Sequence, residues 1–150
     1  MTWRPARPDE DETVVAMCLA LNREDPGTRP VEASQVRRTL AALRADPVRG
    51  RAVVLEEDGA ARGYALLVSF WSNELGGEVC NVDELWVAPE ARGRGQAHAL
   101  ISALQAGTGP WPRVPVAIEL EVSPENARAR ALYEKLGFAP QRNAGMRWRG

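Results

Sequence analysis

Residue types that would point to several common functions are scarce in this sequence of 150 residues. Histidine occurs once, at His98, and the two cysteines, Cys18 and Cys80, lie far apart in the chain. Because neither a metal-ligand cluster nor a Cys-x-x-C pair is present, we expect no metal site and no cysteine nucleophile. Two separate thiols are typical of a reducing compartment, which favours a cytoplasmic protein.

The sequence also lacks an excess of charge of either sign. Lysine and arginine together number 19 against 20 aspartates and glutamates, giving a net charge of −1. A nucleic-acid-binding domain usually carries a basic excess, so no nucleic-acid partner is expected. No apolar run approaches the length of a membrane span, and none follows Arg4 and Arg7 as it would in a signal peptide. We therefore expect no membrane partner.

Hydrophobic periodicity predicts one α/β domain over residues 1–150. The predicted order is β-α-α-β-β-β-α-β-α-β. The expected strands cover residues 3–7, 51–57, 62–70, 78–87 and 116–122, with a closing hairpin at 138–142 and 145–148. The expected helices begin near residues 9, 31, 97 and 126. Because a strand–helix–strand crossover surrounds residues 97–106, its two strands should be parallel neighbours in a mixed sheet.

The stretch from residue 81 to 106 combines an apolar strand, a basic Gly-rich turn and an amphipathic helix. The turn reads RGRGQA at residues 92–97. Its small residues let a ligand approach the backbone, and the helix N-terminus offers free N–H groups to an anion. Arg92 and Arg94 add positive charge. The stretch therefore predicts an anion-binding cradle, but without the third glycine of a dinucleotide site or the Gly-Lys-Ser/Thr of a P-loop.

Two segments resemble the GCN5-related N-acetyltransferase (GNAT) family. Residues 92–97 fit its acyl-CoA-binding motif, R/Q-x-x-G-x-G/A, at every fixed position. Residues 126–138 are similar to its N-x-x-A-x-x-L-Y-x-x-x-G-F block. The resemblance spans about residues 50–140. It implies the acyl-CoA N-acyltransferase fold, acetyl-CoA as cosubstrate without a metal, and transfer of an acetyl group to an amine.

The resemblance also implies which residues hold the cofactor. In the family, the two parallel strands splay apart and the backbone of the first binds the pantetheine arm, while the turn binds the pyrophosphate. Asn126 would lie on the cofactor side, and it could also cap its helix. The residues implied as cofactor ligands are Leu85, Trp86, Val87, Arg92, Gly93, Arg94, Gly95, Gln96, Ala97, Asn126 and Tyr133.

Acetyl transfer to an amine needs a base for the amine proton and an acid for the departing thiolate. Tyr133 is the candidate acid, because a phenol can protonate a thiolate, although packing in the core is the competing role. Asp83 and Glu84 are the candidate bases. As consecutive strand residues they should face opposite sides, with Glu84 on the face of Val82 and Trp86 unless a bulge shifts the pleat. Either carboxylate could instead bind a cationic acceptor without taking its proton.

These observations predict an enzyme that passes the acetyl group directly to a primary amine of a small cationic acceptor, such as a polyamine, an aminoglycoside or an amino-acid derivative. A protein N-terminus or lysine is the alternative acceptor. A non-catalytic acyl-CoA-sensing module and an ATP-binding regulator are the alternatives outside this class. By analogy with the family, the closing hairpin could pair two copies into a homodimer.

Overall fold

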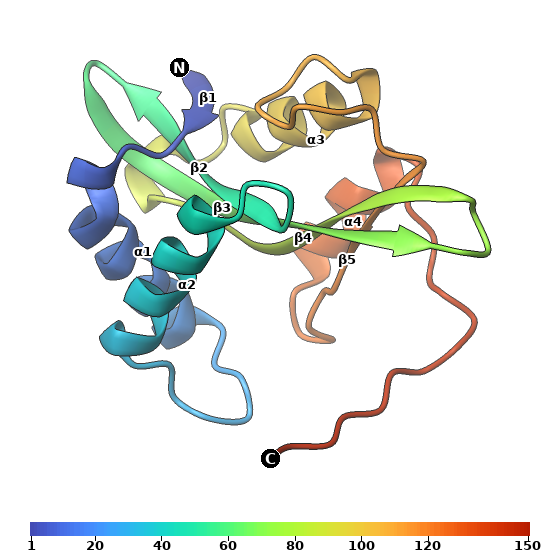
Figure 1. Ribbon diagram of the computed structural model, residues 1–150. Coiled ribbons are helices and arrows are strands. Elements are labelled where there is room, and N and C mark those ends of the chain that lie inside the picture. The colour runs from blue at the N-terminus through green and yellow to red at the C-terminus, as the bar shows by residue number, and fades with distance from the viewer.

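The computed structural model describes residues 1–150, which form one five-stranded sheet of strand order β1-β2-β3-β4-β5. Neighbouring strands are antiparallel except for β4 and β5, which run parallel as expected from the crossover between them (Figure 1). The strands are β1 (Thr2–Pro5), β2 (Gly50–Glu57), β3 (Ala60–Ser72), β4 (Gly77–Val87) and β5 (Ala117–Leu120). The helices are α1 (Asp11–Glu24), α2 (Ala33–Ala45), α3 (Gln96–Ala106) and α4 (Ala127–Lys135), with single 3₁₀ turns at Pro8–Glu10 and Pro89–Ala91.

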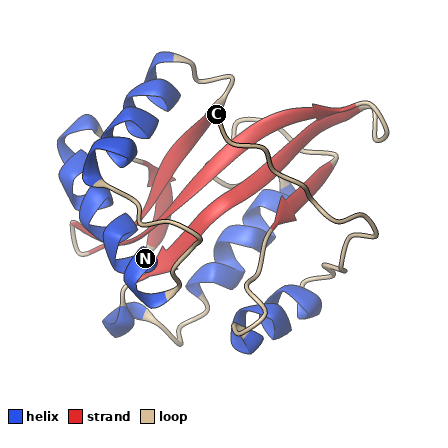
Figure 2. Cartoon of the chain, turned by 90° about the horizontal axis from the view of Figure 1, so that it is seen from below, coloured by secondary structure: helices blue, strands red, loops and turns tan.

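Helices cover both faces of the sheet, so the molecule has three layers and two hydrophobic cores (Figure 2). On one face, α1 and α2 pack through residues such as Val14 and Leu40 against Val54 and Tyr64 of the sheet. On the other face, α3 packs through Leu100, Ile101 and Leu104 against Val53, Leu67 and Val82, and α4 borders the same core through Tyr133 and Leu136. The predicted mixed α/β architecture is confirmed.

The turn between β2 and β3 shows why this hairpin could be recognised in the sequence. Asp58 and Gly59 both have positive φ angles, of 51° and 78°. A tight turn with two positive φ angles matches the right-handed twist of the strands that it joins, and Asp-Gly is a preferred pair for it. β3 in turn pairs with β4, so this antiparallel meander supports β4 along one side.

The predicted closing hairpin is wrong. No strand follows α4, and residues 139–150 form an extended, exposed tail that runs in an open arc to the loop between α1 and α2, where Arg149 donates to the Thr28 hydroxyl at 2.6 Å (Figure 1). Pro140 cannot donate a ladder hydrogen bond, and the two large apolar side chains of the tail, Met146 and Trp148, are 100% and 86% exposed. The alternation of apolar and basic residues at 146–149 resembled a strand, but no sheet face covers the apolar side.

No helix of the structure has both the length and the apolar content needed to cross a bilayer.

Candidate acetyltransferase site

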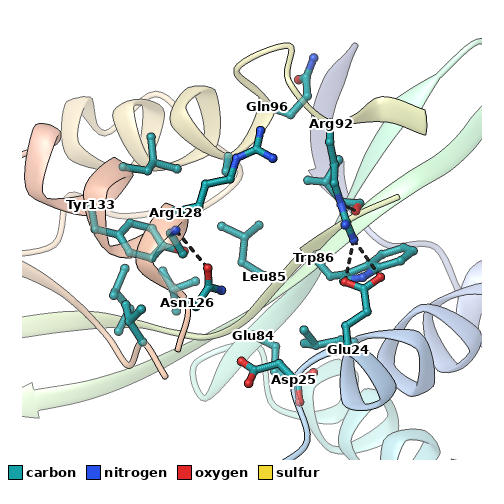
Figure 3. Close-up of a pocket in the computed structure, with 18 of the residues that line it drawn as sticks. Glu24, Asp25, Glu84, Leu85, Trp86, Arg92, Gln96, Asn126, Arg128 and Tyr133 are labelled. Atoms are coloured by element: carbon teal, nitrogen blue, oxygen red, sulfur yellow. Dashed lines mark hydrogen bonds and ion pairs between the residues drawn. The ribbon is translucent and has the colours of Figure 1, made fainter. Parts of the chain in front are cut away.

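The main cleft opens where β4 loses β5 as a partner. The parallel pairing ends at Val82 and Leu120, whereas β4 continues to Val87 on the support of β3. Beyond this point the chain after β5 diverges, leaving a cleft of about 650 Å³. Its walls come from the second half of β4, the turn before α3, the end of α1 and the start of α4. Except for Arg94, the site residues predicted on β4, on the turn and on α4 therefore meet around one cavity (Figure 3).

A β-bulge at Asp83 changes the direction of the side chains along β4. Leu66 pairs with Glu84 whereas the next residue, Leu67, pairs with Val82, so Asp83 is the extra residue. Val82 consequently packs on the α3 side, and Glu84 contacts the α1 side. The expectation that Val82 and Glu84 share a face is wrong, because the bulge shifts the pleat between them.

The two candidate bases occupy different surroundings. Glu84 is half-buried, and its Oε2 accepts hydrogen bonds from the Tyr64 hydroxyl at 2.8 Å and from the Cys18 thiol at 3.5 Å. Burial raises the pKa of Glu84, and the hydrogen bond from Tyr64 opposes that rise. The carboxylate of Asp83 makes no hydrogen bond within the chain, and the residue is exposed to solvent. Desolvation by the surrounding atoms and the negative charge of Glu121 nevertheless raise the pKa of Asp83. Both carboxylates line the cleft.

Tyr133 lies on α4 on the opposite side of the cleft from Glu84 (Figure 3). Its ring is half-buried against the α3 core and meets the ring of Phe138 at a centroid distance of 5.7 Å. The hydroxyl has no hydrogen-bond partner in the chain and is not among the buried unpartnered atoms, so it opens to the cleft. Burial raises the pKa of Tyr133, which keeps the phenol protonated at neutral pH. The ring of Tyr133 therefore packs against the core while its hydroxyl stays open to the cleft.

The turn before α3 has the features of an anion cradle. Gly93 and Gly95 have φ angles of 76° and 74°, a conformation that glycine adopts without steric strain. A Cβ atom at either position would meet no atom within 4 Å, so both face open space. The first N–H groups of α3, at Gln96, Ala97 and His98, have no partner within the helix. These donors line the cleft beside the two glycines, where the helix dipole favours an anion.

The two arginines of the turn are engaged with carboxylates. Arg92 forms an ion pair with Glu24 at the end of α1 at 2.8 Å, and its Nε donates to the Val87 carbonyl at 2.7 Å. Arg94 pairs with Glu57 at 2.7 Å and does not line the cleft. The structure therefore places Arg92 at the rim and Arg94 outside it, and the positive end of the cradle is formed mainly by backbone N–H groups.

Sequence reasoning missed Arg128. This residue, in the first turn of α4, lines the cleft and extends towards Gln96 across it (Figure 3). It makes no ion pair and no hydrogen bond with the rest of the chain, unlike Arg130, which pairs with Glu134 at 3.0 Å. The sequence feature that could have indicated Arg128 is its position two residues after Asn126. Asn126 caps α4, because its Oδ1 accepts the Ala129 N–H at 3.1 Å. A helix that begins after Asn126 places Arg128 and Ala129 of its first turn on the cleft.

Three residues of β4 form the strand edge that lines the cleft. Leu85, Trp86 and Val87 pair with β3 on one side and line the cleft, where β5 no longer continues, on the other. Leu85 packs towards the α3 core and Trp86 towards the α1 core. An extended ligand with amide groups could therefore add to this edge of β4 as a strand would.

Comparison with known proteins identifies the family to which this arrangement belongs. A model of the acetyltransferase (GNAT) family matches residues 14–138. The chain belongs to this family. GNAT acetyltransferases use acetyl-CoA as cosubstrate, and the resemblance based on the two motifs is confirmed.

Individual relatives agree with this membership. A mycothiol acetyltransferase from Beutenbergia cavernae is 41% identical over 80 residues, which are 51% of this chain and 25% of that protein. The chain thus spans about a quarter of the length of this relative. The crystal structure of a possible acetyltransferase from Clostridium difficile 630 has a TM-score of 0.81 at 20% identity, covering 99% of this chain and 96% of that one.

A second solved structure shares the fold over its full length. The ribosomal-protein-alanine N-acetyltransferase from Brucella melitensis biovar Abortus 2308 has a TM-score of 0.72 at 19% identity, and each chain is covered completely. At these identities the two solved structures establish the likeness of the GNAT fold, and the acceptor has to be inferred from the site itself.

Replacing Gly95 should test the cradle directly. Gly95→Val would place a branched side chain in the open space of the turn and should weaken acetyl-CoA binding about tenfold or more, equivalent to about 1.4 kcal/mol. Isothermal titration with acetyl-CoA measures the change. Gly59→Val is the matched control, because Gly59 has a similar φ of 78° and equally open surroundings in the β2–β3 turn. Equal affinities for all three proteins would contradict the cradle.

Replacing Arg128 should test the charge facing the cradle. Arg128→Ala should weaken acetyl-CoA binding about tenfold and reduce its dependence on salt, because a charge-assisted contact to phosphate would be lost. The matched control is Arg130→Ala, which removes an arginine from the same helix outside the cleft. If both variants bind as the unaltered protein does at low and high salt, Arg128 has no role in phosphate binding.

Proposed function

We propose that this domain is an N-acetyltransferase that transfers the acetyl group of acetyl-CoA directly to a primary amine of a small cationic acceptor. The observation that carries the proposal is the distribution of charge within the main cleft. One end presents backbone N–H groups and the unpaired Arg128, and the other presents carboxylates without cationic partners. An anionic cofactor and a cationic acceptor would enter the cleft from these two ends. The proposal treats residues 1–150 as one catalytic domain.

The cofactor end has room and donors for the phosphates of acetyl-CoA. The open glycines and the first N–H groups of α3 would bind the pyrophosphate, with Arg128 facing them from α4. The unpaired edge of β4 at Leu85, Trp86 and Val87 would bind the amide groups of the pantetheine arm. These groups lead from the cradle towards Tyr133 and the bulge at Asp83, so a thioester bound along them would lie between the candidate acid and the candidate bases.

The acceptor end is acidic. Asp25, Asp83, Glu84 and Glu121 line the cleft, and none of them forms an ion pair. Glu24 also lines it but is neutralised by Arg92. Carboxylates of one sign concentrated in a cleft attract cations and lower the free energy of a bound ammonium group. This charge distribution favours polyamine-like, aminoglycoside-like or amino-acid-like acceptors over neutral ones.

The residues around the cleft can carry both proton transfers of the reaction. Acetyl-CoA supplies an acetyl thioester. Glu84 or Asp83 would accept the proton that the amine nitrogen must lose, since the raised pKa of each carboxylate makes it a stronger base. Tyr133 would donate its hydroxyl proton as the C–S bond breaks and regain one from solvent through the cleft. The carboxylate and the phenol thus form a base and an acid on opposite sides.

Direct transfer is favoured because the chain offers no covalent relay. Cys18 and Cys80 are buried, and burial raises the pKa of each thiol to about 12. A thiol with that pKa is almost entirely protonated at neutral pH and is a poor nucleophile. Acetyl-CoA and the amine would therefore have to be bound together.

Ligand-dependent melting and thiol release test the proposal. Acetyl-CoA at about a hundred times its dissociation constant should add roughly 2.7 kcal/mol of stability and raise Tm by several degrees, whereas ATP should not. A thiol-release screen should then show turnover with spermidine or kanamycin and little with neutral amines of similar size. Stabilisation without turnover on any amine would leave a binding module, and no response to either CoA species would remove the cofactor assignment.

Tyr133→Phe tests the acid. The variant keeps the ring that packs on Phe138 but loses the hydroxyl, so kcat should fall about a hundredfold, the lower end of the effect of general acid catalysis. The dissociation constant of acetyl-CoA, measured by titration, should stay within about twofold. An unchanged kcat would show that Tyr133 only packs against the core.

A further inference from the structure

Two donors from two different elements bind only one of the two carboxylate oxygens of Glu84. The hydroxyl of Tyr64 on β3 and the thiol of Cys18 on α1 both donate to the same carboxylate oxygen, Oε2. The other oxygen, Oε1, makes no hydrogen bond with the chain and is not among the buried unpartnered atoms. One oxygen is therefore fixed by the protein and the other is open to the cleft that Glu84 lines.

The two donors are themselves immobile. Tyr64 and Cys18 are 0% and 1% exposed and belong to the core formed between the sheet and helices α1 and α2. Burial raises the pKa of the Cys18 thiol to about 12 and raises that of the Tyr64 hydroxyl further, so both stay protonated and act only as donors at neutral pH. A carboxylate with one oxygen bound to fixed donors loses most of its freedom to rotate.

Asp83 provides the contrast. Its carboxylate makes no hydrogen bond within the chain, and two charges shift its pKa: Glu121 raises it by repulsion, and Arg147 of the C-terminal tail lowers it by attraction. Its carboxylate is therefore free to turn, which suits attraction of a cation better than abstraction of a proton at a defined position. The geometry distinguishes the two acids, one free and one held.

We propose that Tyr64 is a positioning residue, whose hydroxyl fixes Oε2 of Glu84 so that Oε1 meets the amine of the acceptor and takes its proton. Cys18 supports the same oxygen from α1. The proton passes from the neutral amine nitrogen to Oε1 as the nitrogen forms its bond to the acetyl carbon. The C–S bond of the thioester then breaks, and the departing CoA thiolate takes the proton of Tyr133. Tyr64 keeps its own proton throughout. This inference rests on the proposed acetyltransferase function and assigns its base.

The pH dependence of kcat should depend on the hydrogen bonds that Tyr64 and Cys18 donate to Glu84. The titratable groups that act on Glu84 are Asp83 on β4, which raises its pKa, and Tyr64 and Cys18, whose hydrogen bonds lower it. Asp25 lies on the same side of the cleft (Figure 3). A hydrogen bond to the charged carboxylate favours the ionised form, so losing the Tyr64 hydroxyl should shift protonation of Glu84 to higher pH. A merely structural role would leave the pH profile in place.

The experiment compares Tyr64→Phe, Cys18→Ala, Glu84→Gln and the Tyr64→Phe/Glu84→Gln double variant, using the amine with the highest turnover in the screen. Tyr64→Phe should lower kcat about tenfold, leave the KM for acetyl-CoA unchanged and move the acid limb of the kcat profile to higher pH. Cys18→Ala should also shift the acid limb of the kcat profile to higher pH, but by a smaller amount. Glu84→Gln should remove the limb, and the double variant should be no slower than Glu84→Gln alone, because both changes act through one carboxylate.

Ser69→Ala is the matched control. The Ser69 hydroxyl donates to Glu78 at 2.9 Å between the same two strands, outside the cleft, so its loss should leave kcat and the pH profile unchanged. Melting temperatures establish that each variant is folded, and Cys18→Ala tests the same oxygen if Tyr64→Phe does not fold.

Three results would overturn the inference in different ways. An unshifted acid limb in both Tyr64→Phe and Cys18→Ala, with Glu84→Gln inactive, would limit both donors to packing. Full activity of Glu84→Gln would remove Glu84 as the base while acetyl transfer stood. If the unaltered protein turned over no amine, the proposed function would fail and this inference with it.

Discussion

The structure depends most on the point at which β4 keeps one neighbour and loses the other. Up to Val82, β4 is paired on both sides, and beyond it only β3 supports the strand. An unpaired strand edge is normally a liability, because its N–H and C=O groups invite other chains to pair with it. Here the edge faces a cleft closed by α4 and by the N-terminus of α3, so it is available only to a ligand that fits between them.

The β-bulge at Asp83 lies at the same place, and the two features depend on each other. Without the bulge, with Asp83 paired in a regular ladder, Glu84 would lie on the α3 side with Val82, away from Tyr64 and Cys18. With it, one carboxylate is turned to the α1 core while its neighbour stays free. A bulge is tolerated here because the ladder on the β5 side has already ended, so only the pairing with β3 is disturbed.

The fold, and most of the candidate residues that line the cleft, could be predicted from the sequence because both were encoded locally. The strand, the Gly-rich turn and the helix at residues 81–106 are contiguous, and the α4 block carries its own cap at Asn126. What could not be predicted depends on pairing between distant segments. The bulge is a register between β3 and β4, the engagement of Arg92 requires Glu24 of α1, and Arg128 faces the cradle only after α4 docks.

The closing hairpin failed for the opposite reason, because its local pattern was adequate. Met146 and Trp148 alternate with arginines as in a half-buried strand, but a strand needs both an edge to pair with and an apolar face to cover. The tail pairs with neither edge strand of the sheet, and its apolar residues remain exposed. Local alternation therefore indicates that a segment is compatible with a strand, and tertiary contacts decide whether the strand forms.

Two pairs of neighbouring acids show how the same residue type is divided between structure and site. At the end of α1, Glu24 is bound by Arg92, whose guanidinium also lies 5.7 Å from the centre of the Trp86 ring, and Asp25 stays unpaired. An exposed ion pair of this kind adds little stability by itself, but the fork of Arg92 also holds the Val87 carbonyl and so joins α1, β4 and the cradle.

On β4 the division is repeated, with Glu84 held by core donors and Asp83 unpaired. In each pair the longer side chain reaches a fixed partner and the shorter one remains in the cleft. The part of the uncompensated charge in the cleft that comes from Asp25 and Asp83 therefore lies beside longer acids that already make the local contacts.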